Sequence, residues 1–201
     1  MATVEFFYDV SSPWTYYACE RIESFCERNG VELIWKPFLV GGVFNKVNPS
    51  VYERRNNPVP PKDNYYQKDM RDWARYLGIN LIKPSVFPVN SVKALRGAFV
   101  AIDDGKVSAY SRACFKAYWC DDRDISQPDV LLDIVTSVGM DADVFFDNIA
   151  DDKYKQMLFA TTSELIERGG FGSPTFFVNG DDMYFGNDRL ELMQFALDAK
   201  V

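Results

Sequence analysis

The sequence contains no histidine, and this absence removes several classes of enzyme at once. A Ser-His-Asp triad, a histidine general base and a histidine-ligated metal site are all excluded. Basic residues are also few, because 22 Lys and Arg stand against 29 Asp and Glu, for a formal net charge of −7. Proteins that bind nucleic acid need a basic face to displace counterions from phosphates, so we expect no nucleic-acid partner.

Cysteine is sparse, and its spacing excludes the usual cysteine motifs. No two cysteines form a C-x-x-C pair or share metal-ligand spacing, so we expect neither a dithiol redox centre nor a zinc site. The chain also lacks an apolar run long enough to cross a membrane and a basic, then apolar, secretory signal at its start. We therefore expect a cytoplasmic protein with reduced thiols and no membrane partner. The four cysteines are Cys19, Cys26, Cys114 and Cys120.

The N-terminal residues predict a strand, a helix and a second strand. Thr3 to Val10 is rich in β-branched and aromatic residues, as buried strands are. Ser12 suits a helix N-cap and Pro13 the first helical position, where its missing N–H is not needed. The helix should end near Asn29-Gly30, and Val31 to Val40 reads as the next strand. Strand, helix and strand within this length indicate a βαβ unit with a parallel pair.

The C-terminal residues predict two strands and a helix. Residues 175–178 read as a strand, Asn179-Gly180 as a hairpin turn, and residues 183–185 as the returning strand. Asn187 is expected to cap the final helix. Between the two ends the pattern is helical, preceded by a proline-rich stretch from Asn45 to Asp63 that reads as a loop.

The order of these elements indicates the fold class. An α/β chain that reads βαβ, a large all-helical insertion and then ββα is typical of a thioredoxin-like fold with the insertion between its halves. We predict a discontinuous thioredoxin-like domain from residues 1–44 and 170–201, with a helical insertion domain at 45–169.

Three short segments are candidates for chemistry. At the predicted strand-to-helix junction, Ser12 offers a hydroxyl beside the partial positive charge of a helix N-terminus, a place that stabilises a thiolate. Ser173-Pro174 enters a strand after a glycine-rich turn, where a cis proline leaves the preceding N–H and C=O free for a peptide-like ligand. Asn187 and Asp188 could hold the carboxylate and ammonium of an α-amino acid. Taken alone, each could instead be structural: a helix cap, a trans proline opening an edge strand, and a capped helix start.

Together the three segments describe a ligand with a thiolate, a peptide-like middle and an α-amino-acid end. Glutathione has all three features. The chain's own cysteines do not occupy the junction, so the thiolate would be brought by the ligand.

Five motifs occur in order along nearly the whole chain. They are Phe7-Tyr8-Asp9-Val10-Ser11-Ser12-Pro13, Phe87-Pro88-Val89-Asn90-Ser91 with Ala94-Leu95-Arg96, Trp119 with Asp122-Arg123-Asp124-Ile125-Ser126, Gly172-Ser173-Pro174-Thr175, and Phe185-Gly186-Asn187-Asp188-Arg189-Leu190. In combination they resemble the motifs of the 2-hydroxychromene-2-carboxylate isomerases, which are related to kappa-class glutathione transferases within the DsbA-like thioredoxin superfamily.

This resemblance implies roles for particular residues. It implies that Ser12 faces the glutathione sulfur, that Ser173 before a cis Pro174 contacts the cysteinyl backbone, and that Asn187 and Asp188 hold the γ-glutamyl end. It also implies a homodimer and polar contacts from the proline-rich loop, which we place at Asn56 and Lys62. From charge alone, Lys46 is a candidate for an anionic substrate. Aromatic side chains that could line the pocket are Trp14, Phe44, Tyr65 and Trp119.

The resulting hypothesis is a glutathione-dependent isomerase of an unsaturated or aromatic carboxylate. Three alternatives stay open at this point. A kappa-class-like transferase would conjugate glutathione to electrophiles, and a non-catalytic module would bind glutathione or a peptide without turnover. A thiol-disulfide oxidoreductase is disfavoured by the missing C-x-x-C pair.

Overall fold

In the computed structural model, which describes residues 2–199, four strands form one mixed sheet in the order β2-β1-β3-β4. The central strand β1 pairs parallel with β2 and antiparallel with β3, and β3 pairs antiparallel with β4. The predicted parallel pair and the predicted hairpin are both confirmed. The strands are β1 (Thr3–Tyr8), β2 (Glu32–Pro37), β3 (Thr175–Val178) and β4 (Asp182–Phe185).

Helix α1 (Pro13–Asn29) connects β1 to β2 and begins and ends where its sequence predicts. The Ser12 side chain accepts a hydrogen bond from the backbone N–H of Thr15, and Pro13 occupies the first turn. Gly30 closes the helix at a φ of 59°, a left-handed conformation that glycine adopts without a steric penalty. Local capping signals therefore place the start of α1 directly behind the end of β1.

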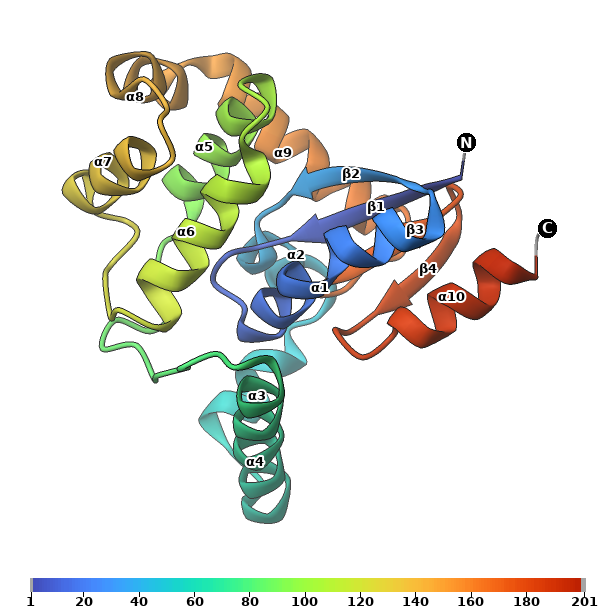
Figure 1. Cartoon of the computed structure of the whole chain (residues 1–201). Helices are drawn as coiled ribbons and strands as arrows, with labels where there is room; N and C mark the ends of the chain where they lie inside the picture. The colour runs from blue at the N-terminus through green and yellow to red at the C-terminus, as the bar shows by residue number, and fades with distance from the viewer. Residues whose placement is uncertain (1, 200–201) are drawn as a thin grey trace.

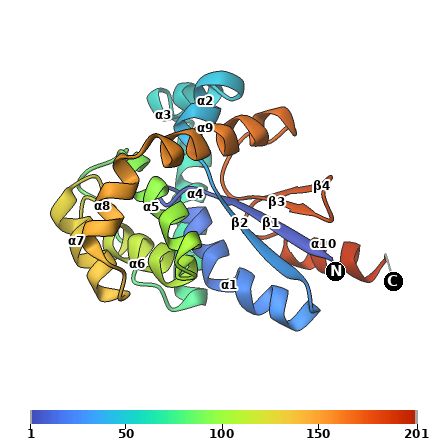
Figure 2. The same cartoon turned by 90° about the horizontal axis from the view of Figure 1, so that it is seen from above.

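Helices cover both faces of the sheet (Figures 1 and 2). Helices α1 and α10 (Leu190–Asp198) lie on one face, while α2 (Val40–Val47) and α9 (Asp152–Glu167) lie on the other. A group of helices packs at one end of the sheet, beside α1 and α9 (Figure 1). These are α5 (Val92–Asp103), α6 (Val107–Trp119), α7 (Pro128–Ser137) and α8 (Ala142–Ala150).

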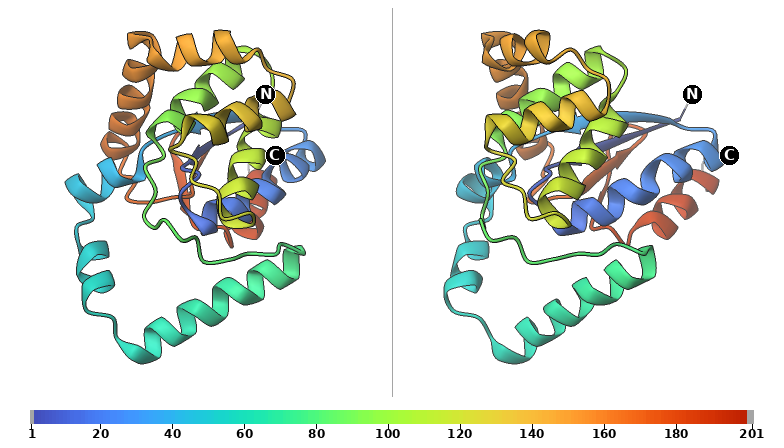
Figure 3. Two further views of the ribbon diagram at one scale, coloured as in Figure 1. Left: turned by 90° about the vertical axis from the view of Figure 1, so that its left-hand side faces the viewer. Right: turned by 60° about the vertical axis from the view of Figure 1, so that its left-hand side comes forward.

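Two further helices, α3 (Ser50–Asn56) and α4 (Pro60–Leu77), extend away from the sheet, and α4 returns alongside α1 (Figure 3). All four strands lie in the two end segments of the chain, and the segment between them is helical. This is the predicted thioredoxin-like arrangement with a helical insertion. The domain boundaries at residues 44/45 and 169/170 stay predictions.

The core is dominated by stacked aromatic rings along β1. The ring of Phe6 stacks on Tyr8 and on Phe176 of β3, in both cases with centroids 5.2 Å apart. Each ring is fully buried, so the alternate side chains of β1 contribute strongly to hydrophobic stabilisation. Within residues 2–199, no helix is both long and apolar enough to span a lipid bilayer.

The structure contradicts two predictions of local structure. The proline-rich stretch from Asn45 to Asp63 is largely helical, because it contains the end of α2, all of α3 and the start of α4. Pro60 and Pro61 occupy the first turn of α4, where a missing N–H does no harm, so they start a helix rather than prevent one. Asn187 is not an N-cap, because α10 begins three residues later, at Leu190.

Candidate functional site

The hydroxyl of Ser12 lies where β1 ends and α1 begins. Its Oγ accepts a hydrogen bond from the Thr15 N–H at 3.3 Å and donates one to the Ser173 carbonyl oxygen, also at 3.3 Å. The side chain is half-buried, so one side of it faces solvent. Ser12 is thus both the helix cap and a direct contact of the second predicted segment, 161 residues away.

The peptide bond between Ser173 and Pro174 is cis, as predicted. The buried Ser173 Oγ accepts from the N–H of Asp9 at 3.0 Å and shares a hydrogen bond with Thr15 Oγ1 at 2.7 Å. The Ser173 carbonyl was expected to be free, but it accepts from Ser12. Within the described chain the N–H of Ser173 has no hydrogen-bond partner.

Backbone hydrogen bonds place Asn187 next to the Ser173-Pro174 turn. Gly186 donates its N–H to the carbonyl of Pro174 at 3.2 Å, and Arg21 of α1 donates to the Asn187 carbonyl at 3.1 Å. The Asn187 side chain is only 4% exposed, yet its Nδ2 finds no hydrogen-bond partner among residues 2–199. A buried amide donor without a partner is unfavourable by about 1 to 3 kcal/mol unless a ligand satisfies it.

Asp188 is exposed and folds back over the backbone of Gly186. Gly186 has a φ of 114°, and a Cβ on it would come within 2.7 Å of Asp188 Oδ1. Only glycine combines this backbone conformation with the close approach. The Asp188 carboxylate is 3.4 Å from the Arg189 guanidinium, and this ion pair helps to hold it beside Asn187.

Asp9 organises the loop that carries Ser12, although sequence reasoning missed it. It is fully buried, and its two carboxylate oxygens accept from the N–H of Ser11 at 2.9 Å and of Val40 at 2.9 Å. The hydroxyl of Ser91 donates to it at 3.3 Å. Burial raises the pKa of the Asp9 carboxyl, and the hydrogen bonds from Ser11, Val40 and Ser91 oppose that effect without cancelling it. One carboxylate therefore joins the site loop, the start of α2 and the start of α5.

Helix α4 contacts α1 beside Ser12. The indole N–H of Trp14 donates to the hydroxyl of Tyr66 at 3.1 Å, and the two rings meet edge to face with centroids 5.4 Å apart. The guanidinium of Arg54 lies over the Tyr66 ring, 4.7 Å from its centroid. These contacts bring a cation of α3 toward the first turn of α1.

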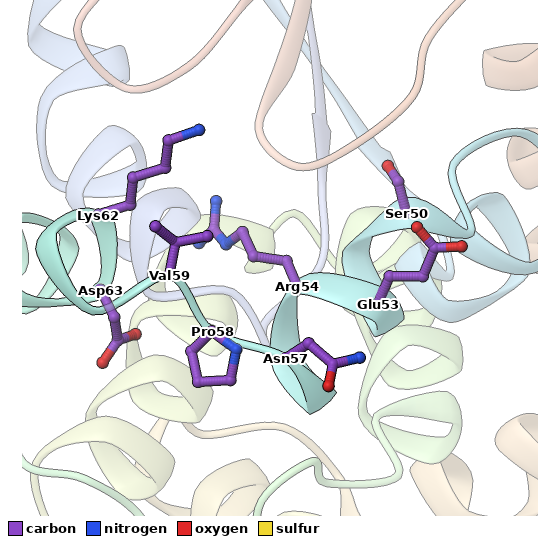
Figure 4. A pocket seen from close by; sticks show the side chains of 8 residues that line it. All are labelled: Ser50, Glu53, Arg54, Asn57, Pro58, Val59, Lys62 and Asp63. Atoms are coloured by element: carbon purple, nitrogen blue, oxygen red, sulfur yellow. The ribbon is translucent and has the colours of Figure 1, made fainter.

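A cavity of about 580 Å³ lies between α3 and α4. Figure 4 shows the Arg54 guanidinium and the Lys62 amine on the same side of the connection between these helices, away from the Asn57 amide. Of the three residues predicted for the substrate, Lys62 lines this cavity, whereas Asn56 and Lys46 are exposed and are not among its lining residues.

The chain's own thiols are poorly placed for nucleophilic chemistry. Cys19, Cys26 and Cys114 are buried, and no disulfide joins any of the four cysteines. Burial raises the pKa of the Cys26 and Cys114 thiols to about 12, and it raises that of Cys19 further. Burial also raises the pKa of the partly exposed Cys120. At neutral pH these groups are neutral thiols, which are weak nucleophiles.

Comparison with known proteins connects this geometry to a family. A family model described as a DSBA-like thioredoxin domain matches residues 3–198. The chain belongs to the DSBA-like thioredoxin family. This membership confirms the fold class that the order of elements predicted.

Within this family the chain is similar to two kinds of enzyme. It is 27% identical to the 2-hydroxychromene-2-carboxylate isomerase of Pseudomonas putida, over 96% of this chain and 93% of the relative. It is also 27% identical to glutathione S-transferase kappa 1 of Homo sapiens, over 98% and 92%. A solved structure of a 2-hydroxychromene-2-carboxylate isomerase superposes with a TM-score of 0.81 at 26% identity, over 98% and 95% of the two chains. The resemblance predicted from the motifs is confirmed.

The sequence carried a partial signal for the residues that were missed. Asp9 stands inside the Phe7-Tyr8-Asp9-Val10-Ser11-Ser12-Pro13 motif, and a carboxylate between a buried strand and a helix start is an unusual position for a charged residue. Thr15, which bonds Ser173 in this DSBA-like fold, looks in the sequence like an ordinary residue of α1. Its role depends on a partner 158 residues away.

Proposed function

We propose that the protein is a glutathione-dependent isomerase of the 2-hydroxychromene-2-carboxylate type, acting on an unsaturated or aromatic carboxylate. The observation that carries this proposal is the continuity of the site. Ser12, Ser173 and Asn187 follow one another along a single edge, joined by the Ser12–Ser173 hydrogen bond and by the bond from Gly186 to Pro174. The similarity to the isomerase of Pseudomonas putida supports the reaction type.

The donors left unpaired in the described chain fit the parts of glutathione. The backbone N–H of Trp14, in the first turn of α1, has no acceptor and carries the partial positive charge of the helix start. It suits the sulfur, while the unpaired N–H of Ser173 suits a peptide carbonyl. The orphaned Asn187 Nδ2 suits the γ-glutamyl carboxylate, and the exposed Asp188 suits its ammonium group.

Ser12 would act by redirecting its hydroxyl proton. In the structure the Oγ donates to the Ser173 carbonyl, and rotation about the Cβ–Oγ bond can redirect that proton to a nearby sulfur anion while Oγ still accepts from the Thr15 N–H. Making a bound thiol mostly thiolate at neutral pH requires stabilising the anion by about 2.7 kcal/mol. A hydrogen bond to a charge contributes about 1.5 to 3 kcal/mol and a helix start up to about 1 kcal/mol. Ser12 and α1 are together sufficient without a histidine.

Ser12 and the first turn of α1 would hold the sulfur of glutathione, and the bound thiolate would supply a nucleophile for reversible addition to a conjugated double bond, so glutathione would not be consumed. The chain would orient the two reactants along the edge formed by Ser12, Ser173 and Asn187. The exposed cations Lys46 and Lys62 and the amide of Asn56 are proposed contacts for anionic groups. A cytoplasmic location and a homodimer remain predictions from the sequence.

A second candidate function is a kappa-class-like transferase that conjugates glutathione to electrophiles. The similarity to human glutathione S-transferase kappa 1, at the same 27% identity, favours keeping this alternative. A non-catalytic glutathione-binding module is the third candidate. All three depend on the same binding edge and differ in the fate of glutathione once it is bound.

Calorimetry and two substrates separate these functions. We expect reduced glutathione at millimolar concentrations to bind with measurable heat. We also expect 2-hydroxychromene-2-carboxylate to be isomerised without consumption of glutathione, while 1-chloro-2,4-dinitrobenzene is conjugated slowly. Turnover of the chloroarene alone would favour the transferase, and binding without turnover would favour the module. No heat of binding would contradict all three, and reduction of insulin would instead support an oxidoreductase.

Asn187→Ala should weaken glutathione binding by about 10- to 100-fold, because a hydrogen bond from the amide to the γ-glutamyl carboxylate is lost. The midpoint of thermal unfolding should fall only slightly. The smaller side chain leaves a cavity, but the variant also removes a buried donor that has no partner in the described chain. Titration with Cys-Gly, which lacks the γ-glutamyl group, is the matched control and should give equal affinities for both proteins. An equal loss of affinity for glutathione and for Cys-Gly would contradict the assignment of Asn187 to the γ-glutamyl carboxylate.

A further inference from the structure

Arg55 lies between two aromatic rings that come from distant parts of the chain. Its guanidinium carbon is 5.9 Å from the ring centroid of Phe44 on α2 and 5.4 Å from that of Phe87, which stands before the cis Pro88. Phe87 is 47% exposed, so part of its ring is open to solvent and to a ligand. Three segments thus contribute to one exposed arrangement of two rings and a cation.

Both rings are connected, through neighbouring residues, to Asp9 and Val10, which directly precede Ser11 and Ser12. The ring of Phe87 contacts that of Trp119, with centroids 6.3 Å apart, and the Trp119 indole N–H donates to the Val10 carbonyl at 3.0 Å. On the other side, Phe44 lies one turn after Val40, whose N–H donates to Asp9. The Arg55 guanidinium is therefore held at the same end of β1 as the Ser12 hydroxyl.

The charge of Arg55 is uncompensated. Among residues 2–199 it forms no ion pair, whereas Arg112, Arg168 and Arg189 each have a carboxylate partner. A guanidinium presents parallel N–H groups that match a carboxylate in a bidentate geometry. The two rings flank the exposed cation and offer apolar surface to a planar ligand.

We propose that Arg55 binds the carboxylate of a planar, conjugated substrate, with Phe44 and Phe87 packing against its plane. This inference rests on the proposed function, because it assigns the second substrate of the same site. From charge alone, Lys46 was instead the candidate contact for an anionic substrate. Lys46 lies on the last turn of α2, and the described structure shows no interaction between it and these two rings.

Binding of a non-reactive probe tests the proposal separately from turnover. By calorimetry we expect the wild-type protein to bind 2-hydroxybenzoate more tightly than 2-hydroxybenzamide, which has the same ring without the charge. Arg55→Gln should weaken binding of 2-hydroxybenzoate by about 10- to 100-fold and change that of the amide by less than about threefold. Arg55→Lys keeps the charge but not the bidentate geometry, so we expect an intermediate loss.

The controls distinguish this proposal from a failure of the proposed function. Arg75→Gln removes an exposed arginine of α4 that pairs with Asp72, and it should leave binding of both probes unchanged. Glutathione affinity should be the same in wild type and in Arg55→Gln. Equal weakening of both probes, or no weakening of 2-hydroxybenzoate, would overturn the role of Arg55. Absent glutathione binding with normal binding of 2-hydroxybenzoate would instead overturn the proposed function.

Discussion

Ser12→Ala is expected to lower kcat/KM of the glutathione-dependent reaction by roughly 100-fold, because one hydrogen bond to the sulfur anion is worth about 1.5 to 3 kcal/mol. The ultraviolet signal of bound thiolate should shift to higher pH for the same reason. Since Ser12 also caps α1, its loss should reduce the free energy of unfolding by only about 1 kcal/mol. Both quantities are measurable on the same preparation.

Asp141→Ala is the matched control for this experiment. Asp141 caps α8 by accepting from the Val144 N–H at 3.0 Å, away from the Ser12 edge. The control should lose a similar free energy of unfolding and keep its activity. If Ser12→Ala retained wild-type turnover, or if Asp141→Ala lost as much turnover, the assignment of Ser12 would fail.

Asp9→Ala is expected to destabilise the fold by about 2 to 4 kcal/mol, since it leaves the part-buried N–H groups of Ser11 and Val40 without their acceptor. Asp9→Asn should be less damaging. A carboxamide offers a single oxygen, so it can satisfy one of the two N–H groups while its NH₂ faces the other. Urea unfolding of wild type and both variants measures these differences.

The pH dependence of this difference has a definite sign. Because burial raises the pKa of Asp9 in the folded state above its unfolded value of about 3.8, the folded state binds the Asp9 proton more tightly. Stability from this group therefore increases as pH falls through the folded pKa. Relative to Asp9→Asn, which cannot titrate, the wild type should gain stability as pH falls from neutral toward the unfolded-state value of about 3.8.

Asp147→Asn, on the exposed surface of α8, is the control for this series. Its free energy of unfolding should stay within about 0.5 kcal/mol of the wild type. A wild-type advantage over Asp9→Asn that shrinks on acidification would contradict the raised pKa. An Asp9→Ala variant as stable as the wild type would show that Asp9 does not hold the site loop.

Elements with local signals could be assigned from the sequence. Ser12 and Pro13 start α1, and Gly30 ends it, because a cap and a first-turn proline act on N–H groups a few residues away. The same holds for the hairpin, where Asn179 and Gly180 have positive φ angles. The resemblance to a known family implied the cis proline at Pro174, whereas its position alone also allowed a trans bond.

Local signals failed where the same residue type has two uses. The prolines of the segment from Asn45 to Asp63 predicted a loop, yet Pro60 and Pro61 begin α4 because proline is tolerated in a first turn. Asn187 resembled a helix cap, but it lies buried before the helix with an unpaired side-chain donor in the described chain. Only packing distinguishes these alternatives.

The assembly of the site depends on contacts between segments that are distant in the sequence. The hydrogen bond from Ser12 to Ser173 spans 161 residues, and Arg55 stands between rings contributed by two other segments. Such contacts depend on the pairing of β1 with β3 and on the way α2 and α5 meet at Asp9. Capping and turn signals act over one helical turn, whereas these contacts arise when distant segments bury their apolar faces together.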